Sequence, residues 1–346
     1  MADVASLRTA LCGDLGIEYP ILSAGIGSAA GAELVSAVSN AGGFGVFGMS
    51  GMKPVEMRGL IGRARELTER PFGVNVIIDE EGWATSEEDR ALLREEVSAA
   101  ADEAVAAIVL FWGDPAPYVD AAHSNGVKVL IQVGSVEEAK AAAAAGVDAV
   151  IAQGVEAGGH VIGTTSIWEL IPAVVKAIDP LPTLASGGIG DGAAVARALE
   201  LGAQGVSLGT RFVASEEAWL HPEYKRRIAD ATAEDTVLNE LYDVWWPGAP
   251  GRTLRNKTLE EWEAAGCPPS GRRPGEGTSI GELRTSTGEV IEWPRYAGAG
   301  SPKPDFEGDL DYAPLWAGES VSAVNDVLPA GEIVRRLVRD AEASLN

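Results

Sequence analysis

One segment combines an amide, several glycines and a histidine: Gln153-Gly154-Val155-Glu156-Ala157-Gly158-Gly159-His160. It directly follows the apolar run 148–152, which is predicted to be a buried strand. Glycines after such a strand let the backbone approach a ligand closely. Imidazole titrates near neutral pH, so it can accept a proton from carbon or, once protonated, orient an anionic substrate. We predict that His160 is the catalytic base.

The other histidines are weaker candidates. His123 falls in a predicted surface helix and His221 precedes Pro222, so both are interpreted as solvated surface groups. A lone histidine is more often structural than catalytic, and His160 differs from these two by its glycine-rich surroundings. Glu156 lies four residues before His160 and could tune it, although a solvated glutamate is the simpler interpretation.

Amide side chains recur at the ends of other predicted strands. Asn75, Gln132 and Gln153 are expected to point into the same opening, at the end of the fold where the predicted strands finish. Buried amides need hydrogen-bond partners, and a heteroaromatic ring with N–H and C=O groups at its edge supplies them. A polar network filled with water is the alternative for any single amide.

Two glycine-rich loops predict a phosphate site. Ser186-Gly187-Gly188 and Gly209-Thr210 follow the last two predicted strands, where β/α barrels commonly hold phosphate. For either loop alone, a tight turn without a ligand is an equal explanation. A phosphate together with a heteroaromatic ring is what flavin mononucleotide (FMN) would present.

The elements that must position these residues alternate between apolar strands and amphipathic helices, which is typical of parallel βα units. We expect eight strands, at 20–23, 43–47, 72–78, 107–111, 128–133, 149–153, 182–186 and 205–211. Helical periodicity is found at 32–41, 54–67, 86–104, 136–145, 166–178 and 192–201. Eight units without a clear break in strand order favour a (β/α)8 TIM barrel over a doubly wound open sheet.

Beyond the barrel the character of the chain changes. We divide it into an FMN-binding barrel at 1–218, an inserted subdomain or lid at 219–316, and C-terminal helices at 317–346 that pack on the barrel. The insertion is expected to hold a helix at 259–265 and a strand at 289–293. Its tryptophans, which include Trp245, Trp246, Trp262 and Trp293, fit a small core, a lid or a homodimer contact.

Composition excludes several classes of protein. The formal net charge of −24 opposes generic nucleic-acid binding. Cys12 and Cys267 lie far apart without metal-type spacing, so we expect no metal site and a reducing, cytoplasmic setting. The N-terminus does not resemble a secretory signal, and no apolar run has the length of a membrane helix.

The motif at 152–160 closely resembles that of the nitronate monooxygenase family, formerly called 2-nitropropane dioxygenases. Similar motifs follow in the family's order at 72–76, 185–189 and 208–212. The resemblance implies an FMN-dependent oxidoreductase that converts alkyl nitronates, and in some members nitroalkanes, with dioxygen into carbonyl compounds and nitrite or nitrate. It also implies that His160 is the catalytic histidine.

The resemblance and the strand ends together give a predicted cofactor-binding set. Its members are Gly25, Asn75, Gln132, Gln153, Gly158, Gly159, Ser186, Gly187, Gly188, Ser207, Leu208, Gly209 and Thr210. The chain departs from the family at Ala24-Gly25-Ile26, where many relatives carry Ala-Pro-Met, and this puts the choice of substrate in doubt.

Two other functions remain open from the sequence. Related FMN enzymes reduce or dehydrogenate enoyl thioesters or quinones with NAD(P)H, and they share the glycine-histidine segment. The acidic chain lacks the basic patch that would bind CoA or a carrier protein. A flavin-binding barrel without catalysis, acting as a sensor or scaffold, is the third interpretation.

Overall fold

The centre of the molecule is a closed barrel of parallel strands. The computed structural model describes residues 7–284, 290–298 and 300–346. Its barrel strands are β1 (Ile21–Ser23), β2 (Gly45–Gly48), β3 (Phe72–Ile77), β4 (Ala107–Phe111), β5 (Lys128–Val133), β6 (Ala149–Gln153), β8 (Thr183–Ser186) and β9 (Gly205–Leu208). They are ordered β1-β9-β8-β6-β5-β4-β3-β2.

Hydrogen bonds between the two ends of this order close the barrel. Ser23 N donates to Phe44 O over 3.0 Å, and Phe44 N donates to Ile21 O over 2.9 Å. The predicted TIM barrel is therefore confirmed, and an open doubly wound sheet is excluded.

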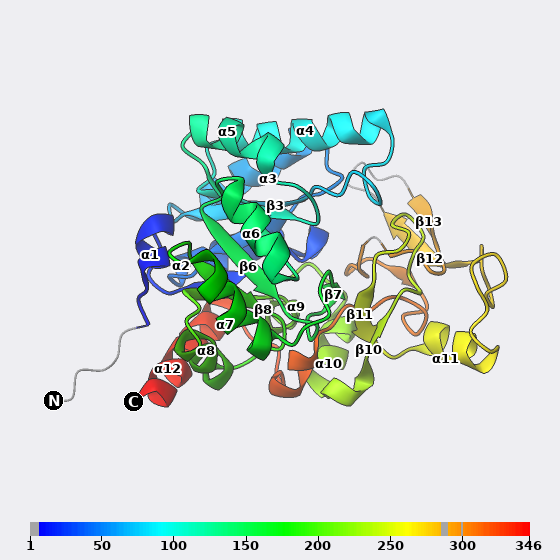
Figure 1. Ribbon diagram of the computed structural model, residues 1–346. Coiled ribbons are helices and arrows are strands. Elements are labelled where there is room, and N and C mark those ends of the chain that lie inside the picture. Colours follow the sequence, from blue (N-terminus) through cyan, green and yellow to red (C-terminus); the bar gives the residue numbers. More distant parts are fainter. Residues whose placement is uncertain (1–6, 285–289, 299) are drawn as a thin grey trace.

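Helices cover the outside of the barrel (Figure 1). They are α1 (Ala10–Leu15), α2 (Ala32–Asn40), α3 (Pro54–Leu67), α4 (Glu87–Asp102), α5 (Ala116–Ser124), α6 (Val136–Ala144), α7 (Ile167–Ile178) and α8 (Gly192–Glu200), with a single turn η1 (Gly27–Ala29) after β1. Side chains fix where several of them begin: Ser135 accepts from Glu138 N over 3.2 Å, and Asp191 accepts from Ala194 N over 2.8 Å. The predicted helices are confirmed to within a few residues.

Two predicted elements differ from the structure. The strand expected at 205–211 ends at Leu208, and the helix α9 (Thr210–Val213) follows. Arg211 lies in this helix, and its buried guanidinium pairs with Asp326 over 2.8 Å. In the C-terminal segment only α12 (Ala330–Leu345) is an α-helix, and the turn η3 (Glu319–Ala323) precedes it. Pro329 lies directly before α12. Its ring disfavours helical dihedrals at the preceding residue, so η3 does not continue into α12.

The segment after α9 builds a second layer beside the barrel, at the right of Figure 1. Its elements are α10 (Pro222–Asp230), η2 (Ala233–Asp235), β10 (Thr236–Asn239), β11 (Gly251–Leu254), α11 (Lys257–Ala264), β12 (Ser279–Arg284), β13 (Val290–Pro294) and β14 (Glu307–Gly308). The strand predicted at 289–293 corresponds to β13, and Glu289 lies outside the described residues. The division at 218 and 316 stays a prediction.

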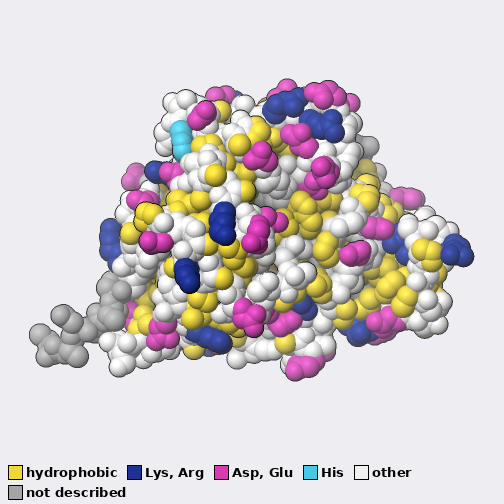
Figure 2. Space-filling model, in the orientation of Figure 1, with side chains coloured by type: hydrophobic (Ala, Val, Ile, Leu, Met, Phe, Trp, Pro, Cys, Tyr) yellow, Lys and Arg dark blue, Asp and Glu magenta, His cyan; other side chains and the backbone are white. Residues whose placement is uncertain are grey.

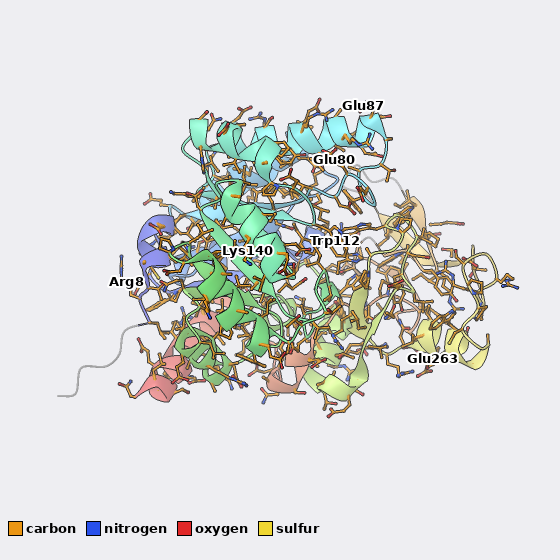
Figure 3. The ribbon with its side chains drawn as sticks, in the orientation of Figure 1. Arg8, Glu80, Glu87, Trp112, Lys140 and Glu263 are labelled. Atoms are coloured by element: carbon orange, nitrogen blue, oxygen red, sulfur yellow. The ribbon has the colours of Figure 1, made fainter. Side chains whose placement is uncertain are left out.

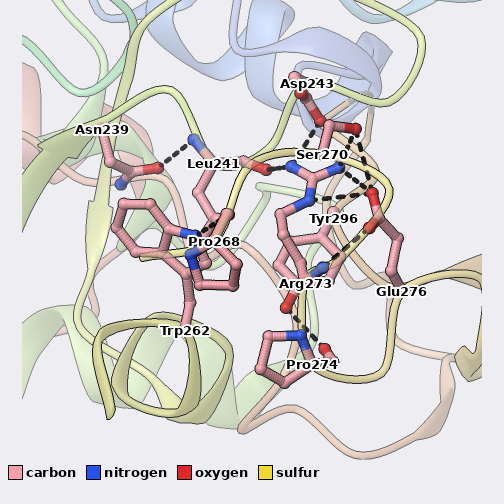
Figure 4. Close-up of polar contacts among 10 residues, drawn as sticks. All are labelled: Asn239, Leu241, Asp243, Trp262, Pro268, Ser270, Arg273, Pro274, Glu276 and Tyr296. Atoms are coloured by element: carbon pink, nitrogen blue, oxygen red, sulfur yellow. Dashed lines mark hydrogen bonds and ion pairs between the residues drawn. The ribbon is translucent and has the colours of Figure 1, made fainter. Parts of the chain in front are cut away.

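A buried arginine organises this layer (Figure 4). Arg273 donates to Asp243 over 2.8 Å, to Glu276 over 2.6 Å and to the Leu241 carbonyl over 3.0 Å. Its guanidinium also lies 4.4 Å from the ring centre of Tyr296. Because a buried guanidinium needs several acceptors, these contacts fix the loops around it.

The surface agrees with the acidic composition. On the face in Figure 2, acidic side chains are spread among scattered lysines and arginines. Within the described ranges, no helix is both long and apolar enough to cross a membrane.

Candidate active site

The carboxyl ends of the barrel strands surround a cavity of about 350 Å³. Every residue predicted to bind the cofactor or act in catalysis lines it: Gly25, Asn75, Gln132, Gln153, Gly158, Gly159, His160, Ser186, Gly187, Gly188, Ser207, Leu208, Gly209 and Thr210. The structure thus brings the predicted set together. The individual role of each residue stays a prediction.

His160 is held by the barrel and by the inserted layer. With Gly159 it forms the short strand β7 (Gly159–His160), which pairs antiparallel with β11 so that His160 lies opposite Gly251. From the barrel, Gln153 Nε2 donates to the His160 carbonyl over 3.0 Å, and Gln153 Oε1 accepts from Ile162 N over 3.1 Å. The Gln153 amide therefore positions the histidine loop, a role that the sequence did not indicate.

Two indole rings flank the His160 imidazole. The ring centre of Trp246 lies 4.3 Å away and that of Trp316 lies 5.0 Å away. Burial lowers the pKa of His160 from 6.5 to about 4, and the Pro250 and Ala249 carbonyls only partly oppose this shift. The imidazole is consequently neutral at pH 7. Its Nδ1 atom is buried and has no hydrogen-bond partner among the described residues.

Glu156 has a structural role away from His160. Its Oε2 atom accepts from Ile167 N at the start of α7 over 3.0 Å, and Oε1 accepts from the Ser166 hydroxyl. The carboxylate therefore stabilises a helix N-terminus. The two other histidines also make structural contacts: His123 lies 2.8 Å from Asp148, and His221 Nδ1 accepts from Glu223 N over 3.1 Å.

The glycine-rich loops leave room for a ligand at their backbone. Gly187 and Gly188 have φ angles of +94° and +68°, which other residues adopt at a cost. A Cβ atom on Gly25 would lie 2.5 Å from Asn75 Cβ, so glycine is required where the loop after β1 crosses β3. The donor set beside these loops, Ser186, Ser207 and Thr210, suits a phosphate that is bound by amides and hydroxyls.

Five aromatic residues of the cavity wall were not predicted as site residues. They are Trp83, Phe111, Tyr224, Trp246 and Trp316. The sequence predicted for Trp246 only a place in a small core, a lid or a homodimer contact. Tyr224 holds the backbone of this wall, because its hydroxyl donates to the Trp316 carbonyl over 2.6 Å. A tryptophan pair in an insertion was the available signal, but it does not reveal which ring faces a cavity.

Charge is missing from the cavity wall. Its described lining contains no Asp, Glu, Lys or Arg residue. In the part of the chain that the structure describes, no cluster of His, Cys, Asp or Glu could hold a metal ion. The cavity therefore offers amides, hydroxyls, aromatic rings and one neutral imidazole.

A family model described as nitronate monooxygenase matches residues 8–340. The chain belongs to the nitronate monooxygenase family. It is 31% identical to a nitronate monooxygenase of Pseudomonas aeruginosa over 94% of this chain and 97% of that protein. The resemblance inferred from the motifs is confirmed.

The proteins to which this chain is similar carry names for different activities. The chain is 36% identical to a Mycobacterium tuberculosis protein named (3aS,4S,5R,7aS)-5-hydroxy-7a-methyl-1-oxo-octahydro-1H-indene-4-carboxyl-CoA dehydrogenase, over 75% of this chain and 69% of that protein. It is also 32% identical to the solved structure of FabK from Thermotoga maritima, with a TM-score of 0.79 and coverage of 98% and 97%. This member of the nitronate monooxygenase family is a flavin oxidoreductase.

Proposed function

We propose that the protein is an FMN-dependent nitronate monooxygenase that oxidises alkyl nitronates and nitroalkanes with dioxygen. The observation that carries this proposal is the neutral, desolvated imidazole of His160 in the wall of a cavity whose described lining holds no Asp, Glu, Lys or Arg residue. A neutral imidazole is the form that accepts a proton, and a carbon acid such as a nitroalkane has a proton to give.

The cavity residues fit FMN. The amides and hydroxyls at Ser186 to Gly188 and Ser207 to Thr210 would hold its phosphate, and Asn75 and Gln132 would meet the edge of its ring system. When bound, FMN supplies the means of taking electrons from the substrate and passing them to dioxygen. Glycine at position 25 lets the loop after β1 pass close to Asn75, because a Cβ atom there would lie 2.5 Å from Asn75 Cβ.

His160 has the task of removing the α-proton. Burial beside the indole rings keeps its imidazole in the neutral, proton-accepting form down to about pH 4, and the imidazole must pass the proton on because its protonated form is disfavoured at pH 7. For nitronates that are already ionised this step is not needed. The overall reaction balances when two nitronates and one dioxygen give two carbonyl compounds and two nitrites.

A reductase or dehydrogenase of enoyl thioesters or quinones that uses NAD(P)H is the second candidate. The similarity to FabK over almost the whole chain favours it. The uncharged lining disfavours it, because CoA and NAD(P)H carry two or more phosphates beyond the single one of FMN that the glycine amides and hydroxyls would hold, and enzymes commonly bind such groups with Lys or Arg.

Stopped-flow absorbance of the FMN-loaded protein separates the two. Anaerobic mixing with the nitronate of 2-nitropropane should reduce the flavin rapidly, and NADH or NADPH should not. Fast reduction by a nicotinamide with no response to nitronates or nitroalkanes would contradict the proposal. In air, an oxygen electrode and a colorimetric nitrite assay run together should give two nitrites for each dioxygen consumed.

The variant His160→Asn tests the proton step. We expect it to bind FMN normally and to lose at least about 100-fold in kcat/KM with neutral nitroalkanes. The loss with preformed nitronates should be much smaller. Equal losses with both substrate forms would remove His160 from proton transfer.

A further inference from the structure

The wall around His160 is made of aromatic rings on more than one element. Trp83 lies in the loop after β3, Phe111 ends β4, and Trp246 and Trp316 come from the inserted segment. The ring centre of Trp246 lies 5.4 Å from that of Trp83 and 5.1 Å from that of Trp112. Figure 3 labels Trp112 on the side of the barrel that is nearer the insertion. The cavity next to the imidazole therefore meets ring faces and edges.

A buried carboxylate fixes the central ring of this wall. Asp79, which follows β3 and is 8% exposed, accepts from Trp246 Nε1 over 2.8 Å through Oδ2. Its Oδ1 atom accepts from the backbone of Glu81 and of Gly82, each over 3.0 Å. The Trp246 N–H is thus already used, and the rest of its indole serves as a non-polar surface.

The backbone around the wall is strained in the way expected of a constrained site. Trp112 and Trp245 have φ angles of +62° and +77°, a region that bulky residues avoid. At position 245 this turn leaves Trp245 48% exposed, while Trp246 is only 2% exposed. Both residues keep these unfavourable dihedral angles, and the ring of Trp246 packs against His160.

Trp316 is also held through its polar atom. Its Nε1 atom donates to the Gly300 carbonyl over 3.1 Å. Lys303 follows the lining residue Ser301 in the chain but is not part of the described lining. Its ammonium lies 4.4 Å from the ring centre of Trp219 instead. The space beside His160 thus offers stacking surface and no charge to neutralise an ionic substituent.

We propose that the rings of Trp83, Trp246 and Trp316 form a specificity wall that selects substrates whose substituent is aromatic and uncharged. This inference rests on the proposed function for the reacting nitro group, and it adds the class of group that the nitro carbon carries. An aryl ring gains offset or edge-to-face contacts that an aliphatic ring of the same size does not make. A carboxylate on the substituent itself would lose its hydration against this wall without a partner.

A matched set of unreactive ligands tests the wall without relying on turnover. Benzamide, cyclohexanecarboxamide and 4-carbamoylbenzoate, which carries a charge on its aromatic substituent, are titrated into the FMN-loaded protein, and binding is followed by flavin absorbance and tryptophan fluorescence. We expect benzamide to bind about threefold to tenfold more tightly than cyclohexanecarboxamide, and 4-carbamoylbenzoate to bind at least about tenfold more weakly than benzamide. Equal affinity of the two amides, or tighter binding of 4-carbamoylbenzoate than of benzamide, would overturn the proposal.

Variants assign the preference to the wall. Trp246→Leu should abolish the aromatic preference, whereas Trp245→Leu, at the neighbouring exposed position, should leave it unchanged. Because Trp246 is buried, Trp316→Leu at a half-exposed position provides a second variant, and it should reduce the preference. A preference that survives both Trp246→Leu and Trp316→Leu would contradict the proposal.

Failure of the wall and failure of the proposed function give different results. If no nitro compound reduces the flavin but benzamide is still preferred, the reaction is wrong and the wall stands. If nitronates reduce the flavin but aryl ligands have no advantage, the wall is wrong and the reaction stands.

Discussion

At the scale of single residues, the unusual group is a histidine whose pKa lies far below the ordinary value. His160 was found from its sequence neighbourhood, but its low pKa comes from Trp246 and Trp316, which are distant in the chain. Residue type predicted the chemistry, and burial decided the protonation state. Two predictions follow from burial of titratable groups.

The first concerns acid sensitivity. The pKa of His160 is about 4 in the folded protein and 6.5 when exposed, so the unfolded chain binds the extra proton between these values. The free energy of unfolding should therefore fall as pH drops from 6.5 to 4, by on the order of 3 kcal/mol from this group. Urea denaturation at both pH values should show a clearly smaller drop in His160→Asn. An identical drop in both proteins would refute the burial argument.

The second concerns a buried acid. Glu96 is 2% exposed, and its Oε1 atom accepts from Gly51 N over 2.7 Å. Gly51 lies in the chain between Ser50 and Met52, which line the cavity. Burial raises the pKa of Glu96 to about 8, although the N–H groups of Gly51 and Met52 oppose the shift. The folded protein then holds the proton more tightly, so this contribution to stability is lost as pH rises from 4.5 through 8.

Relative to the wild type, Glu96→Gln should accordingly gain stability between pH 6 and pH 9, by on the order of 3 kcal/mol. Thermal unfolding at the two pH values measures this. The exposed neighbour Glu95 provides the control, since Glu95→Gln should show no such pH-dependent difference. A destabilised Glu96→Gln at pH 9 would mean that the carboxylate is needed in its charged form.

At the scale of elements, the loops that follow the strands carry the site, and close backbone contacts hold them. A Cβ atom on Gly158 would lie 2.3 Å from Gly318 N, where the loop after β6 meets the segment before η3. Gly318 N also donates to Thr210 Oγ1 over 2.9 Å, which links this contact to α9. Three segments of the cavity wall therefore depend on one another.

Gly158→Ala should destabilise the protein by about 1–3 kcal/mol and weaken FMN binding, because the clash is with backbone that cannot rotate away. Gly62→Ala is the matched control, since a Cβ atom there meets nothing within 4 Å and Gly62 lies inside helix α3. That control should be about 0.5–1 kcal/mol more stable than the wild type. Urea midpoints and FMN titrations measure both, and a neutral Gly158→Ala would show that the loop can yield.

At the scale of the whole molecule, the inserted layer and the barrel form one active site. Arg252 of β11 donates to the Val155 carbonyl over 2.9 Å and pairs with Glu319 over 3.1 Å. It thereby joins the inserted sheet to the loop that carries His160. We expect barrel and insertion to unfold in a single transition, with far-UV circular dichroism and tryptophan fluorescence changing together.

Arg252→Met should lower the free energy of unfolding by about 2 kcal/mol, because buried acceptors lose their donor. Arg255→Met is the control: Arg255 forms an exposed pair with Glu263 over 2.6 Å, and its loss should cost less than about 1 kcal/mol. Two separate unfolding transitions in the wild type would show that the layer is an independent domain.

The sequence by itself determined the barrel, the positions of most barrel strands and helices, and the cavity-lining set that includes Asn75, Gly188 and His160. These features depend on local periodicity, on caps such as Asp191, and on the rule that the carboxyl ends of parallel strands meet at one face. Such signals act over a few residues and can be read from one chain.

Only the tertiary structure decided which aromatic rings surround His160 and what the amide of Gln153 holds. The contacts of Trp246 with Asp79 and of Gln153 with Ile162 depend on loops whose paths have no local periodicity. The ion pair that joins Arg211 of α9 to the remote Asp326 likewise has no signal in the local sequence. Contacts between distant segments select the ring that faces the cavity, and they set the pKa of the base.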